Sequence, residues 1–153
     1  MIHLLLGVEP FSEPETQAVR DYVTSLFPDQ KAPGDFESAP DDTTGVFLDV
    51  HSFGNLVLYP FSWTDLPAGN KKELETLGRK FGYFTGTDGE AYNVTNVTPW
   101  ITGLYATDGD SMAWTYDEFG VASYTVELGT KFFQDTEYFI KNIKKKFLYL
   151  SPG

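Results

Sequence analysis

Few side chains in this sequence combine a reactive type with a suggestive position, and Glu127 is the clearest of them. It lies near the C-terminal end of Val121 to Leu128, a mostly apolar stretch rich in β-branched residues, which follows an acidic loop around Gly109 and a predicted short helix. A carboxylate inside a sheet loses hydration that it must recover from other partners. Glu127 is therefore a candidate functional carboxylate. The alternative is a solvated carboxylate where an edge strand ends, and the stretch alone leaves both open.

Histidine, the commonest metal ligand and general base, is scarce here, since the chain holds only His3 and His51. His51 ends a second apolar stretch that begins at Gly45, and a short apolar run from Leu56 to Pro60 follows it. A lone histidine after an apolar strand is more often a hydrogen-bonded core or rim group than a ligand. On its own, His51 therefore leaves both interpretations open.

Taken together, these two stretches resemble the zinc metallocarboxypeptidases of the carboxypeptidase A type, from about Pro10 to about Phe139. In that family a His-Ser pair ends a central strand, as His51 and Ser52 do here. The family's mobile tyrosine would be Tyr105, and its general base and acid would be Glu127, twenty-two residues later. Order, spacing and residue type agree at once, which makes the resemblance more specific than a single motif.

The resemblance implies zinc as the cofactor and the C-termini of peptides or proteins as substrates. His51 would be the third zinc ligand, through a neutral imidazole nitrogen. Glu127 would take a proton from the zinc-bound water and pass it to the leaving amine. Tyr105 would close over the substrate, and Ser52 would contribute to binding it.

The resemblance also implies a pocket for the last side chain of the substrate, lined by Asp110, Met112 and Thr125. Met112 would supply an adaptable apolar lining, and Asp110 would pair with a Lys or Arg side chain. The implied enzyme accepts both apolar and basic C-terminal residues. Asp110 has an alternative role as the N-cap of a helix that starts near Ser111, and the sequence does not separate the two.

Two departures from the family pattern matter. The first two zinc ligands of the family lie on an H-x-x-E motif, and neither His3 nor His51 has a glutamate three residues on. The arginines that grip the substrate carboxylate are also unmatched, because Arg20 and Arg79 both lie on predicted helices.

We therefore expect residues 1–153 to be a single unit, the C-terminal portion of a peptidase catalytic domain. Such a portion should bind zinc weakly or not at all, be inactive alone, and tend to self-associate through unpaired sheet edges.

Composition excludes several other classes of protein. The net charge of -11 argues against a nucleic-acid partner, and no apolar run approaches the length of a membrane span. The absence of cysteine removes disulfides, thiolate zinc sites and cysteine nucleophiles.

Export cannot be read from the chain, although the family resemblance implies a secreted or periplasmic parent. The competing class is a non-catalytic carboxypeptidase-like module that binds peptides or a partner protein.

Hydrophobic periodicity, capping motifs and proline-rich runs predict the elements that must position these residues. Helices are expected over Ser12 to Phe27 and Asn70 to Phe84, the first with a capping box formed by Ser12 and Glu15. The run from Pro28 to Thr44 is proline-rich and acidic, which indicates a connector.

The strand from Gly45 to His51 is nearly all apolar, as expected for a strand that is covered on both faces. A further strand over Ile2 to Val8 and a last helix that contains Ile140, Ile143 and Phe147 complete the prediction. The expected fold is α/β, a carboxypeptidase-like mixed sheet flanked by helices, with the strands that end at His51 and Glu127 close together.

Overall fold

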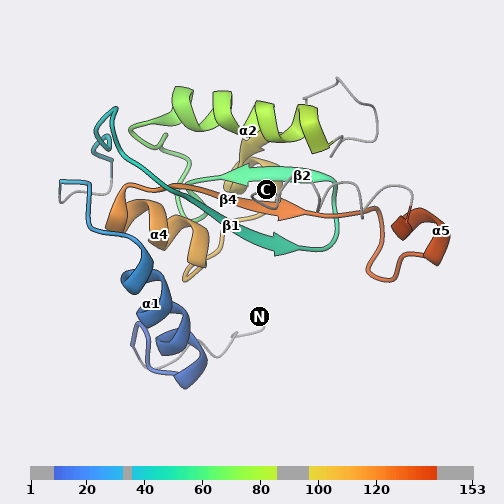
Figure 1. The fold of residues 1–153 in the computed structure, drawn as a ribbon, viewed down its shortest axis with the longest axis horizontal. Coiled ribbons are helices and arrows are strands. Elements are labelled where there is room, and N and C mark those ends of the chain that lie inside the picture. Colours follow the sequence, from blue (N-terminus) through green and yellow to red (C-terminus); the bar gives the residue numbers. More distant parts are fainter. Residues whose placement is uncertain (1–8, 33–35, 86–96, 141–153) are drawn as a thin grey trace.

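The computed structural model describes residues 9–32, 36–85 and 97–140, and its centre is a four-stranded mixed sheet (Figure 1). The strands lie in the order β1 (Val46–His51), β4 (Ala122–Glu127), β2 (Leu56–Tyr59) and β3 (Val97–Pro99). β1 runs parallel to β4, β2 runs antiparallel to β4, and β3 runs parallel to β2. The predicted mixed α/β sheet is therefore confirmed.

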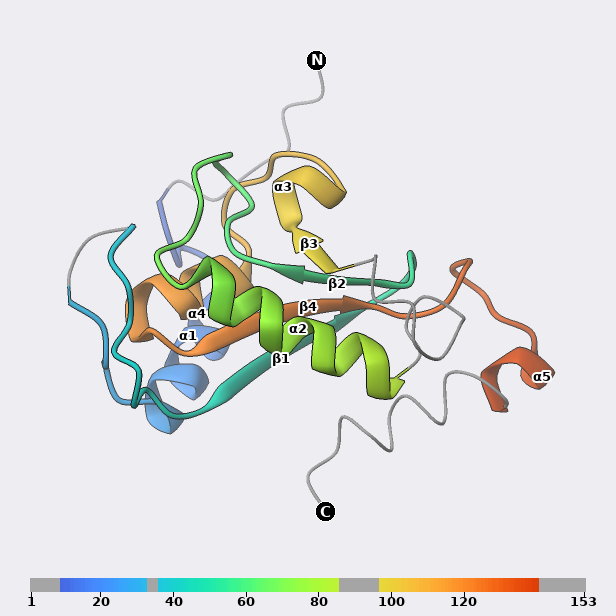
Figure 2. The same cartoon turned by 90° about the horizontal axis from the view of Figure 1, so that it is seen from above.

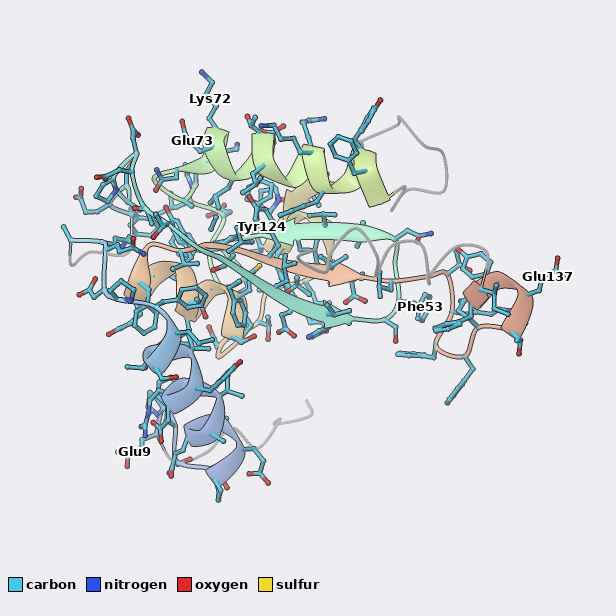
Figure 3. The ribbon with its side chains drawn as sticks, viewed as in Figure 1. Glu9, Phe53, Lys72, Glu73, Tyr124 and Glu137 are labelled. Atoms are coloured by element: carbon cyan, nitrogen blue, oxygen red, sulfur yellow. The ribbon has the colours of Figure 1, made fainter. Side chains whose placement is uncertain are left out.

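Helix α2 (Lys71–Thr85) covers one face of this sheet, crossing over the strands as Figure 2 shows. Tyr124 of β4 points up between the sheet and α2, whereas Lys72 points away into solvent (Figure 3). The Tyr124 hydroxyl donates to the carbonyl of Leu74 at 2.8 Å, and its ring packs edge-on against Phe81. The apolar stripe of the predicted helix thus faces the core, as its spacing indicated.

Helix α4 (Ser111–Phe119) lies on the opposite face, and α1 (Pro14–Leu26) lies beside it (Figure 1). Gly120 ends α4 in the left-handed conformation, with φ of 72°. Val23 of α1 packs with Phe119 and Val121 in a small buried cluster. The α1 helix is therefore attached to the sheet through the end of α4 rather than lying on the strands.

The predicted capping box at the start of α1 is wrong. The helix begins at Pro14 with Glu13 as its N-cap, and no side chain caps it. The Ser12 hydroxyl donates instead to the neighbouring Glu13 carboxylate at 3.0 Å. Pro14 has no N–H to be satisfied in the first turn, so the helix starts one residue later than the motif requires.

The predicted burial of β1 on both faces is also wrong for this chain. Its outer edge pairs with no strand among the described residues, and Val46 and Val50 are more than 40% exposed. An almost wholly apolar strand is typical of a position inside a sheet, so its place at an edge leaves apolar surface uncovered. The sequence of β1 thus suits an interior strand, whereas β1 is the outermost of the described strands.

Two short helices complete the described chain: α3 (Trp100–Gly103), which follows β3, and α5 (Thr136–Tyr138), which follows β4. No helix in the described ranges is long and apolar enough to cross a membrane. The predicted strand over Ile2 to Val8 lies outside the described residues, as does the predicted last helix beyond Ile140.

Candidate active site

His51 and Glu127 meet at the same end of two neighbouring parallel strands. They are register partners, each the last residue of its strand, and the amide of Leu128 donates to the carbonyl of His51 at 2.9 Å. His51 Nδ1 lies 3.9 Å from Glu127 Oε1. The expectation that the two strand ends lie close together is therefore confirmed.

Glu127 is not a solvated carboxylate at an edge, because β4 lies between β1 and β2 and the residue is only 6% exposed. Its Oε2 atom is buried with no hydrogen-bond partner in the described part of the chain. Burial raises the pKa of Glu127 above its ordinary value, and Asp49 adds to this effect while His51 opposes it. A buried carboxylate that holds a proton more tightly than usual is suited to general acid–base chemistry.

Asp49 is the second carboxylate beside the histidine. It lies two residues before His51 on β1, so both side chains project from the same face of the strand. Asp49 Oδ1 is 3.2 Å from His51 Nε2, and Asp49 Oδ2 accepts a hydrogen bond of 2.5 Å from the Ser111 hydroxyl. The imidazole therefore has a carboxylate oxygen near each of its two nitrogens.

Tyr105 follows α3 in an exposed segment, and its side chain is 65% exposed. Trp100 lies between it and the histidine, because the Trp100 ring is 6.4 Å from the rings of both His51 and Tyr105 and roughly perpendicular to each. The Trp100 indole N–H also donates to the Tyr105 carbonyl at 3.0 Å. The structure thus places Tyr105 on the histidine side of the molecule with an unburied ring.

Asp110 is the N-cap of α4, because its Oδ1 accepts from the amide of Ala113 at 2.7 Å. Its Oδ2 accepts from the hydroxyl of Ser62, which is fully buried. The helix-capping alternative that the sequence left open is therefore present. Both donors are uncharged, so these contacts do not neutralise the carboxylate.

Met112 and Thr125 are buried rather than open to solvent. Met112 is 0% exposed within the main core, and Thr125 is 1% exposed on β4, two residues before Glu127. The Thr125 hydroxyl has no hydrogen-bond partner among the described residues. Neither residue is among those that line the hollow beside His51.

Ser52 is exposed immediately after β1, at an open hollow of about 660 Å³. His51 also lines this hollow, and its other walls come from Val50 and from the segment after β4, including Phe132 and Phe133. Phe133 is 92% exposed. The histidine can therefore be reached from solvent along an apolar surface.

A catalytic zinc requires three protein ligands and one open position, and the described residues match that donor set only in part. His51 offers an imidazole whose Nδ1 faces Glu127, as a ligand beside a general base would. No group of three or more His, Cys, Asp or Glu side chains that could hold a metal occurs within the described ranges. The described residues thus offer a donor for one ligand position and a carboxylate beside it, and any further ligands lie outside these ranges.

Sequence reasoning did not assign a role to Asp49, Trp100 or Ser62. Asp49 had a detectable signal, because a carboxylate two residues before a histidine on a strand must share its face. Trp100 and Ser62 had none, because the Trp100–His51 and Ser62–Asp110 contacts join segments that are distant in sequence.

Comparison with known proteins agrees with this architecture. The family model for zinc carboxypeptidase, Peptidase_M14, matches residues 5–149. The chain is 32% identical to bovine (Bos taurus) carboxypeptidase O over 123 residues, which are 80% of this chain and 28% of that protein. It is 34% identical to carboxypeptidase B of Astacus astacus over 125 residues, which are 80% of this chain and 35% of that protein.

The fold is also similar to a solved structure, bovine thrombin-activatable fibrinolysis inhibitor in complex with tick carboxypeptidase inhibitor. The TM-score is 0.70 at 20% identity, and the match covers 94% of this chain and 45% of that one. The chain therefore spans less than half the length of each of these proteins, and because the family model matches residues 5–149, it belongs to the zinc carboxypeptidase family.

Proposed function

We propose that this chain is the C-terminal part of a zinc carboxypeptidase catalytic domain, in which Glu127 is the general base and His51 is one of the zinc ligands. The observation that carries the proposal is the register of β1 and β4, which brings a buried carboxylate against an accessible imidazole. Burial separates this pair from an ordinary surface contact, because desolvation is the main cause of the raised pKa of Glu127.

His51 would hold the zinc together with ligands from the rest of the domain, and the metal would supply Lewis-acid activation of the scissile carbonyl and of water. Glu127 accepts a proton from the attacking water at its carboxylate and delivers it to the leaving amine. His51 holds its imidazole at the strand end, where β1 fixes the backbone. Tyr105, on its exposed segment, closes over the substrate and excludes water.

For specificity, we propose that α4 and the end of β4 line the pocket for the C-terminal side chain. Met112 and Thr125 are fully buried now, so substrate would reach them only after the surrounding segment moves. Asp110 accepts hydrogen bonds from two uncharged donors, the Ala113 amide and the Ser62 hydroxyl. A basic side chain would pair with Asp110, and an apolar one would contact Met112. Ser52, exposed beside the hollow, would contact the peptide.

The longer protein that completes the domain would add the remaining zinc ligands and a grip on the substrate carboxylate. Its strands would cover the open edge of β1, whose apolar sequence suits an interior position. We propose that this parent is secreted or periplasmic and acts on peptide or protein C-termini. The 153-residue chain by itself would be inert, because positioning and the metal each contribute several kcal/mol to lowering the barrier.

Zinc content tests this proposal directly. By equilibrium dialysis, we expect the 153-residue chain to bind zinc weakly or not at all, and the completed protein to hold one zinc per molecule. His51→Ala in the completed protein should remove that zinc, whereas His3→Ala, the matched loss of the other histidine, should not. One tightly held zinc in the His51→Ala protein would show that His51 is not a ligand.

A further inference from the structure

Asp49 contacts His51 but has no role in the proposed reaction. Its two oxygens have different partners: Oδ1 is 3.2 Å from His51 Nε2, and Oδ2 accepts from the Ser111 hydroxyl at 2.5 Å. The hydrogen bond from Ser111 therefore holds the Asp49 carboxylate in place beside the histidine.

The anchor of Asp49 is itself held firmly. Ser111 is the first residue of α4, and the helix start is fixed by the Asp110 cap. The Ser111 carbonyl accepts a hydrogen bond of 2.7 Å from the Thr115 hydroxyl one turn later. Because α4 packs against β1 and β4, the Asp49 carboxylate is held at a defined distance from the imidazole.

A neutral imidazole carries one proton, and its partners decide which nitrogen holds it. At His51 the nearer carboxylate oxygen lies at Nε2, 3.2 Å away, and the farther one lies at Nδ1, 3.9 Å away. The shorter contact favours a proton on Nε2, which leaves the lone pair on Nδ1 directed toward Glu127. Carboxylates behind metal-binding histidines fix the ring in this way.

We propose that Asp49, anchored by Ser111, is a positioning residue that holds His51 as the Nε2–H tautomer and presents Nδ1 as the donor atom. What Nδ1 binds rests on the proposed function, whereas the tautomer itself does not. A purely structural alternative is that Asp49 only ties α4 to β1. In that case its loss lowers stability and leaves the tautomer as it was.

Nitrogen NMR of the 153-residue chain, labelled with ¹⁵N in its two histidines, separates these alternatives. His3→Gln assigns the signals, and spectra are recorded at a pH where the ring is neutral. We expect Nε2 to be protonated and Nδ1 to be unprotonated in the wild-type chain. In Asp49→Ala the ratio of the Nε2–H to the Nδ1–H form should fall roughly fivefold, because the carboxylate 3.2 Å from Nε2 is removed.

Two further variants complete the test. Ser111→Ala frees Asp49 from its anchor and should lower the ratio in the same direction by a smaller factor. Asp65→Ala removes an exposed carboxylate from the loop before α2 and should leave the ratio unchanged. If Asp49→Ala does not fold, the wild-type ratio and Ser111→Ala still decide the matter.

An Nδ1–H tautomer in the wild-type chain would overturn the proposal, and so would an unchanged ratio in folded Asp49→Ala. Either result leaves the proposed peptidase function standing, because that function is measured by zinc content and turnover. Conversely, a completed protein that holds no zinc through His51 would refute the function and leave the tautomer result intact.

Discussion

Glu127 is held in a position where its ionised form is disfavoured. It is 6% exposed, its Oε2 has no partner among the described residues, and the opposing attraction of His51 does not cancel the effect of burial. A group buried in this way lowers the stability of the folded chain when it is charged. Functional groups are often placed at such a cost because their altered proton affinity is needed for the reaction.

Glu127→Gln should therefore stabilise the isolated chain at neutral pH. The pKa of Glu127 is raised in the folded state, so the wild type loses stability as pH rises from the ordinary carboxyl pKa through the folded value. Below the ordinary value the penalty is absent, and above the folded value it is complete. In urea unfolding at pH 8 we expect a gain of about 1–2 kcal/mol for the variant, which should fade in acid.

Glu118→Gln is the matched control, since Glu118 is exposed near the end of α4 and should give no such gain. A Glu127→Gln chain that is less stable than wild type at pH 8 would show that the carboxylate has a partner which the structure does not reveal. At this scale the sequence predicted that His51 and Glu127 lie close together and that Asp110 could cap a helix, and the structure shows both. The sequence could not supply Trp100 as the residue between His51 and Tyr105, because that contact depends on where β3 lies.

At the scale of elements, the helices differ in how they begin. The α4 helix has a side-chain cap from Asp110, which also accepts from the buried Ser62 hydroxyl. The α1 helix has none, although Ser12 and Glu15 have the spacing of a capping box. Apolar spacing predicted the extents of α1 and α2 to within two residues at each end. It failed at the start of α1, because the position of Pro14 decided where the first turn begins.

Removing the two candidate caps should have unequal effects. Asp110→Ala should destabilise the chain by roughly 2 kcal/mol, because it removes the α4 cap and leaves Ser62 with an unmet hydroxyl. Ser12→Ala should change stability by less than about 0.5 kcal/mol. Thermal unfolding followed by circular dichroism measures both, and equal losses would contradict the assignment of the caps. In the completed protein, Asp110→Ala should also reduce the removal of a C-terminal Lys or Arg more than the removal of a C-terminal Phe or Leu.

At the scale of the whole molecule, the described sheet is packed against a closed core on one side, and its other side, at β1, is open. The core around Val57, Tyr59 and Tyr124 is closed, and α2 covers it. The other side ends at β1, an apolar strand with an unpaired outer edge in the described chain. The sequence predicted the fold class and the family from paired motifs. It could not show that β1 is the outermost of the described strands, because an apolar strand has the same sequence pattern whether or not a neighbouring strand is present.

The central claim is that Glu127 performs acid–base chemistry beside a zinc held in part by His51. The most direct measurement is the turnover and zinc content of the completed protein carrying Glu127→Gln, with Glu118→Gln as its control. We expect Glu127→Gln to keep one zinc and the wild-type fold while losing cleavage of peptides that end in Phe, Leu, Lys or Arg by a factor of about 10²–10⁴ or more. A zinc-loaded Glu127→Gln protein that turns over at the rate of the Glu118→Gln control would contradict the account.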